Sequence, residues 1–245
     1  MGRRLTRPAV QRLVLFLCAT ITTFAAWRWL AGAALVMPHH ANGGTHGFLY
    51  AVAMWQVMVV AMMTPTVLPW ITAFARLSTP GPLNAAGTWA PGPTIAFTGG
   101  YFIVWLGYSV AAALLQLTVQ QAGWMTGDRL TTSMASVALM GSGASQFLPL
   151  KQACLSHCRN PLTYFLANWR NGPIGGLRMG VVHGAYCLGC CWLVMLSGFA
   201  LGVMNLAWMA VLTVVLCVEQ LAPGGAWLGR AFGAGLVLWG LSLLM

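Results

Sequence analysis

Long runs of apolar residues, interrupted by short polar segments, dominate the pattern along the 245-residue chain. Each run is close to the roughly 20 residues that an α-helix needs to cross the hydrocarbon core of a bilayer. In lipid the backbone must satisfy its own hydrogen bonds, so such runs fold as helices. The pattern predicts an all-α, polytopic transmembrane helical bundle of about seven spans, near residues 12–36, 49–74, 94–120, 130–149, 174–199, 203–222 and 226–245.

The first apolar run follows a basic N-terminal segment, as the apolar region of a secretory signal peptide does. It is long and lacks a small-residue cleavage site, so we expect an uncleaved first helix. The sequence contains no strong internal repeat and no segment polar enough for an aqueous domain. We therefore expect a single integral membrane domain over residues 1–245, whose first 11 residues are a basic cytoplasmic tail.

Composition supports a membrane protein and narrows its chemistry. The chain is 59% hydrophobic and only 6% charged, which lies outside the range of soluble proteins. Its net charge of +10 comes from scattered basic residues, whereas a nucleic-acid binder needs a basic patch on one face. Two acidic residues nearly exclude paired acid–base catalysis, so the candidate chemistry rests on five His, seven Cys and fourteen Met.

The basic residues also predict the orientation of the chain. Alternating the seven spans places ten of the twelve Lys and Arg on one side, with Arg129 opposite and Arg28 inside the first helix. By the positive-inside rule the crowded side is cytoplasmic. We expect a multi-pass protein of the bacterial inner membrane, with its N-terminus in the cytoplasm and its C-terminus outside.

Two groups of cysteines stand out, while Cys18 and Cys217 are read as small buried apolar residues. The first group, Cys154, His157 and Cys158, lies in a polar segment on the expected cytoplasmic side. In a helix, residues at i, i+3 and i+4 share one face, and two thiolates with an imidazole suit zinc or copper. A reduced turn without any ligand is an equal alternative.

The second cysteine group lies within the fifth expected span. His183, Cys187 and Cys191 are four residues apart and form one helical stripe, with Cys190 beside it. Glycines nearby would let a neighbouring helix approach closely. This group favours an intramembrane metal site over a packed interface of small residues, and it lies in a different membrane layer from the first.

A stripe of methionines on the second span offers a partner face. Met54, Met58 and Met62 are also four residues apart, and counting from opposite membrane faces puts Met58 level with Cys187. Thioether, thiolate and imidazole ligands together select Cu(I) over hard cations. A methionine stripe that only packs is the alternative.

Two further features remain. On the expected outer side, His39, His40 and His46 follow Met37 in one short loop, and they could capture copper or zinc. A solvated loop with incidental histidines is equally consistent with the pattern. Glu219, an acidic residue inside the sixth span, is expected to pair with a loop arginine such as Arg178 or Arg230.

Four sequence segments resemble a known bacterial family, described as predicted metal-binding integral membrane proteins and otherwise a domain of unknown function. The resemblance runs from about Tyr50 to the C-terminus. It implies membrane location and metal ligation by the Cys and His residues. In that family the sixth helix often ends in an acidic–basic pair, where this chain has Glu219-Gln220. The segments are Trp55-Gln-Val-Met58 with Ala61-Met62-Met63-Thr-Pro65, Pro149-Leu-Lys151-Gln-Ala-Cys154-Leu-Ser-His-Cys158-Arg159-Asn-Pro161, Gly180 to Trp192, and Gly202-Val-Met204-Asn205.

These observations lead to one main hypothesis and two alternatives. The main one is a membrane protein that binds a soft metal, copper before zinc, and transports it or delivers it to a metal chaperone or larger membrane complex. A thiol–disulfide oxidoreductase using Cys187, Cys190 and Cys191 is the first alternative, since Cys187 and Cys190 form a Cys-x-x-Cys pair. A non-catalytic subunit of a membrane complex is the second. The sequence favours a binding protein over an enzyme, and it has no phosphate-binding loop for ATP.

Overall fold

The computed structural model describes residues 7–36, 45–78 and 91–245. They are mostly helical, apart from a small antiparallel hairpin of β1 (Met125–Thr126) and β2 (Arg129–Leu130). The expected all-α architecture is confirmed for this part of the chain. The helices are α1 (Arg7–Val36), α2 (Thr45–Leu77), α3 (Pro91–Gln121), α4 (Thr132–Ser145), α5 (Pro149–Cys158), α6 (Pro161–Asn168), α7 (Gly172–Leu196), α8 (Gly198–Leu201), α9 (Leu206–Leu221) and α10 (Gly225–Ser242).

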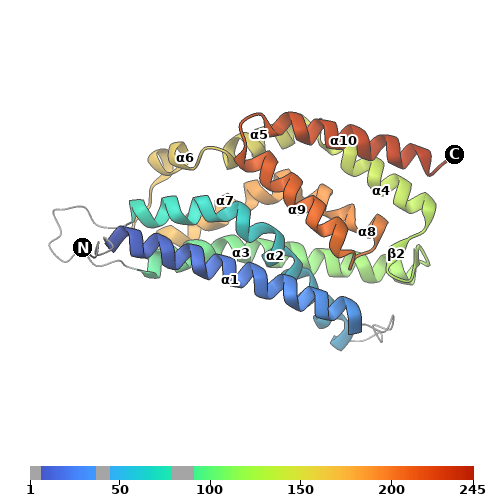
Figure 1. Cartoon of the computed structure of the whole chain (residues 1–245), viewed down its shortest axis with the longest axis horizontal. Helices are drawn as coiled ribbons and strands as arrows, with labels where there is room; N and C mark the ends of the chain where they lie inside the picture. Colours follow the sequence, from blue (N-terminus) through green and yellow to red (C-terminus); the bar gives the residue numbers. More distant parts are fainter. Residues whose placement is uncertain (1–6, 37–44, 79–90) are drawn as a thin grey trace, which may run out of the picture.

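Four helices, α1, α2, α3 and α7, are long and apolar enough to cross a membrane. Figure 1 shows them running along the long axis of the molecule, with α1 against α2, α2 against α3, and α3 against α7. The α3–α7 contact is close because glycines face the partner backbone. A Cβ atom on Gly180 would overlap the carbonyl oxygen of Phe97, and one on Gly100 would overlap that of Leu177. This is the small-residue packing that membrane helices use.

The other three expected spans are helical but short. The helices α4, α9 and α10 have 14, 16 and 18 residues, whereas a crossing takes about 20. The helix α10 packs against both α4 and α9, and the three lie in the part of the molecule that contains the C-terminus (Figure 1). Within the described residues, four helices rather than seven are therefore both long and apolar enough for a membrane span.

The segment between the expected spans 130–149 and 174–199 was expected to be a polar cytoplasmic loop, but residues 149–168 form the helices α5 and α6. Pro149 and Pro161 occupy first-turn positions, where the missing N–H group costs nothing. The helix α5 packs against α7 and buries Lys151, Cys154 and Cys158. The loop expectation was wrong because the polar side chains of this segment find partners inside the bundle.

Candidate metal centre

Three cysteines from two helices meet in the interior of the bundle. Cys187 and Cys190 lie almost one turn apart on α7, and Cys158 is the last residue of α5. Their three Sγ atoms all lie within 4.8 Å of one another, and all three side chains are buried. We call Cys158, Cys187 and Cys190 the sulfur trio. The two cysteine groups, expected in different membrane layers, thus contribute to one cluster.

The spacing and the donor type of the sulfur trio fit a soft metal ion. With metal–sulfur bonds of about 2.3 Å, three sulfur atoms around one ion stand roughly 4 Å apart. The observed limit of 4.8 Å is close to that value. Thiolate sulfur selects ions such as Cu(I) and zinc, whereas magnesium and calcium require oxygen ligands.

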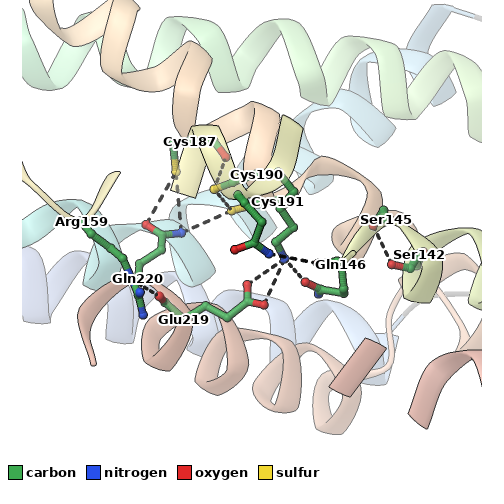
Figure 2. Close-up of polar contacts among 11 residues, drawn as sticks. Ser142, Ser145, Gln146, Arg159, Cys187, Cys190, Cys191, Glu219 and Gln220 are labelled. Carbon is green, nitrogen blue, oxygen red and sulfur yellow. Dashed lines mark hydrogen bonds and ion pairs between the residues drawn. The ribbon is translucent and has the colours of Figure 1, made fainter. Parts of the chain in front are cut away.

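Polar groups from α3 and α9 surround the sulfur atoms. The hydroxyl oxygen of Tyr101 lies 3.3 Å from Cys187 Sγ, and Gln220 Nε2 donates to Cys191 Sγ at 3.3 Å. Cys191 Sγ lies 3.1 Å from Cys190 Sγ, so a fourth thiol adjoins the trio. Figure 2 shows the Gln220 amide facing Cys187 and Cys191. Such neighbours orient metal ligands and tune their basicity.

A buried ion pair joins α5 to α9. Lys151 Nζ donates to the two carboxylate oxygens of Glu219, at 3.0 and 2.9 Å, and the two side chains are only 5% and 2% exposed. Lys151 also donates to the Gln146 side chain, which Figure 2 shows beside the Glu219 carboxylate. The expectation that Glu219 pairs with a loop arginine, such as Arg178 or Arg230, is therefore wrong.

Two neighbours complete the surroundings of this ion pair. Arg159 donates to the carbonyl oxygens of Glu219 and Ala222, at 2.9 and 2.8 Å, and so satisfies carbonyl groups at the end of α9. Gly229 of α10 provides the space for the carboxylate, because a Cβ atom there would overlap Glu219 Oε1. The position of α9, and with it Gln220, is thus linked to both α5 and α10.

Trp70 of α2 connects two histidines with the trio. Its indole Nε1 donates to the carbonyl oxygen of Cys158 at 2.8 Å, and its ring stacks on His183 at a centroid distance of 3.7 Å. His157 lies 6.0 Å from Trp70 and stacks at 3.7 Å on Tyr186. Within the part of the chain that the structure describes, His183 Nδ1 and His157 Nε2 are buried without a hydrogen-bond partner. Buried polar atoms are normally paired, so both nitrogens are candidates for a ligand.

Burial affects two ionisable groups of α5, which lies outside the four long helices. It lowers the pKa of His157 and raises the pKa of Cys154, because an apolar surrounding disfavours the charged form of each. His157 is therefore neutral near pH 7. Cys154 lies one turn before the trio's α5 cysteine, and its Sγ packs against Gly189 of α7, 2.8 Å from where a Cβ atom would stand.

Ring contacts set the register between α2 and α7. Trp70 stacks on His183, and Trp55 lies 5.2 Å from Phe199. The two contacts are 15 residues apart on α2 and 16 apart along α7 and the following α8, in opposite chain directions. The two helices therefore run antiparallel and in step.

This register decides which methionine lies level with the cysteines. From the Trp70–His183 contact, eight residues back along α2 and eight residues forward along α7 bring Met62 level with Cys191. Both are buried in the same core. Met58 is also buried but lies two turns from the level of Cys187, so these two residues are not opposite each other as expected.

Of the expected outer histidines, the structure describes His46, which lies far from the cysteines. His46 is exposed in the first turn of α2, and His39 and His40 fall outside the described residues. Met62 is 16 residues from His46, which corresponds to about 24 Å along a helix. His46 and the sulfur trio therefore cannot hold the same ion.

A family model described as PpoB2, copper chaperone, matches residues 52–243. The chain belongs to the PpoB2 copper chaperone family. No curated protein and no solved structure matches it. The region that matches the copper chaperone family contains the whole sulfur trio, whereas the outer histidines precede it.

Three residues at this centre were missed from the sequence, namely Trp70, Tyr101 and Gln220. The two aromatic residues lie in apolar runs rich in aromatic side chains, so nothing in the pattern distinguished them. Gln220 carried a usable signal, because an amide within an apolar span needs a partner.

Proposed function

We propose that this member of the copper chaperone family binds Cu(I) at the sulfur trio and delivers it to an acceptor, either a soluble metal chaperone or a larger membrane complex. The observation that carries the proposal is the convergence of three buried Sγ atoms within 4.8 Å, in a chain of a copper chaperone family. We prefer copper to zinc because the donors around the trio are soft. A site made of sulfur and imidazole ligands, without a carboxylate, suits Cu(I).

Further side chains that can bind a soft metal lie around the trio. Cys191 adjoins Cys190, and Met62 lies at the same level on α2. His183 lies one turn before Cys187 with an unpartnered nitrogen. We propose these three residues as additional ligands, because Cu(I) accepts thiolate, thioether and imidazole. Cys154, one turn before Cys158, is a spare thiol for exchange.

The outer side would supply copper through a separate group. We propose that His39, His40 and His46 capture the ion outside the membrane. Met58, buried between the levels of His46 and Met62, would serve as an intermediate thioether ligand.

We further propose that the chain crosses the bacterial inner membrane seven times, with a cytoplasmic N-terminus. The short helices α4, α9 and α10 would cross where the bilayer is locally thinned, which short spans can induce. The start of α1 and the end of α10 lie toward opposite ends of the long axis in Figure 1, as an odd number of spans requires.

Elemental analysis of the purified protein tests the copper proposal. Wild-type protein is expected to retain Cu(I) under reducing conditions, and Cys158→Ser, Cys187→Ser and Cys190→Ser are each expected to lose most of it. Ser cannot replace a thiolate as a soft ligand. Cys18→Ser and Cys217→Ser are matched controls, because these cysteines lie on α1 and α9 outside the trio. Copper-free wild-type protein would contradict the proposal.

One observation also favours a thiol–disulfide oxidoreductase. The two cysteine groups were expected in different membrane layers, which would separate the thiols, but Cys158 lies beside Cys187 and Cys190, so a disulfide between α5 and α7 needs no large motion. Forming this disulfide from two thiols releases two electrons and two protons, which would pass to a quinone. Thiol alkylation of protein taken directly from cells distinguishes the two functions. Copper delivery predicts reduced cysteines throughout, whereas a disulfide that forms and disappears with the quinone redox state supports the oxidoreductase.

A further inference from the structure

Two adjacent residue pairs from α5 and α7 face each other at the edge of the metal centre. Cys158 meets Cys187 inside, and the preceding residue of each helix, His157 and Tyr186, stack on each other at 3.7 Å. Tyr186 is 40% exposed. The sulfur trio is therefore separated from the molecular surface by one layer of rings, in which His157 is the group able to bind a metal.

The other sides of the trio are closed by residues of the described chain. Tyr101 lies against Cys187 on the α3 side, and Gln220 covers the sulfur atoms on the α9 side. Toward the other end of α7, the fully buried rings of Trp55 and Trp105 fill the core. At the α5–α7 edge, by contrast, the exposed ring of Tyr186 directly precedes a trio cysteine along α7.

His157 has a nitrogen without a function in the fold. Its Nε2 is buried and has no hydrogen-bond partner among the described residues, although leaving a buried nitrogen unpaired normally costs stability. The other contacts of the ring are aromatic: it stacks on Tyr186 and Trp70 and meets Tyr164 edge to face. A phenyl ring could make these contacts equally well, so packing alone does not account for a histidine here.

We propose that His157 is the exchange ligand through which Cu(I) passes between the sulfur trio and its acceptor or donor at the Tyr186 edge. This proposal rests on the proposed function. On release, a bond forms between Cu(I) and His157 Nε2 as one Cu(I)–Sγ bond breaks. The sulfur keeps its electron pair and remains a thiolate, so the step needs no proton. Copper remains Cu(I), so no electron is transferred.

Transfer kinetics test this role in the full-length protein. Cu(I)-loaded protein in lipid nanodiscs is mixed with bathocuproine disulfonate, a water-soluble chelator that absorbs light when it binds Cu(I). His157→Phe keeps the stacking ring and removes the nitrogen, so we expect unchanged copper content and transfer about tenfold slower, the scale of lost metal-site interactions. His157→Met restores a soft donor and is expected to restore the rate. Trp124→Phe, at an exposed ring of the β-hairpin region, is the control.

The outcomes separate this proposal from the proposed function. Wild-type transfer rates in His157→Phe would overturn the exchange role while leaving copper binding intact. Wild-type protein that holds no Cu(I) would overturn both. If His157→Phe holds less copper than wild type, His157→Ala decides the question, because free imidazole in the buffer then restores fast transfer only where a nitrogen ligand is missing.

Discussion

Gln220 places an N–H donor beside two sulfur atoms in an apolar surrounding. Its Nε2 lies 3.3 Å from Cys191 Sγ and 3.9 Å from Cys187 Sγ. A hydrogen bond to a thiolate stabilises its negative charge, and this effect is larger where water is excluded. Gln220 should therefore raise the affinity for Cu(I) without binding the metal itself.

Gln220→Leu is expected to lower the affinity for Cu(I) by about tenfold, as is typical when a group that supports metal ligands is removed. Competition with a chromophoric Cu(I) chelator measures the affinity. Gln121→Leu, at the exposed end of α3, should leave it unchanged. Equal affinities of Gln220→Leu and wild type would show that the amide only packs.

At the residue scale, donor identity was predictable and donor grouping was not. The stripe formed by His183, Cys187 and Cys191 follows directly from helical spacing. The addition of Cys158 depends on how α5 packs sideways against α7, and a hydropathy pattern carries no information on lateral contacts. The same limit explains why Lys151 was missed as the partner of Glu219.

Among the elements, α5 is the least expected and the most closely tied to the site. It contributes one member of the sulfur trio, and the Lys151–Glu219 pair fixes it to α9. The sequence pattern located the apolar helices well because long spans need sustained hydrophobicity. It missed α5 as a buried helix because its interior face is polar, and polar side chains normally indicate solvent.

Lys151→Met is expected to destabilise the protein by about 3–5 kcal/mol, because it leaves the Glu219 carboxylate buried without a partner. The double variant Lys151→Met/Glu219→Leu should recover most of this loss. Unfolding in detergent, followed by circular dichroism, gives the free energies. Arg129→Met, from the exposed pair with Asp128, is the control and should change stability by at most about 1 kcal/mol. A double variant no more stable than Lys151→Met would contradict the ion-pair account.

The orientation of the whole molecule is open to a direct test. If the chain crosses seven times from a cytoplasmic N-terminus, alkaline phosphatase fused after Met245 should be active, because this enzyme folds only where disulfides form. Green fluorescent protein inserted near Arg170, between α6 and α7, should fluoresce in the same membranes as a cytoplasmic control. An inactive C-terminal phosphatase would indicate an even number of crossings.

The ligand type of the sulfur trio also determines which other metal ions can compete for this site. It offers no oxygen ligand, so magnesium and calcium cannot occupy it whatever their abundance. Silver is a soft monovalent ion like Cu(I) and finds the same ligands. A cell that relies on this protein for copper should therefore suffer copper starvation when it meets silver, even with copper in plentiful supply.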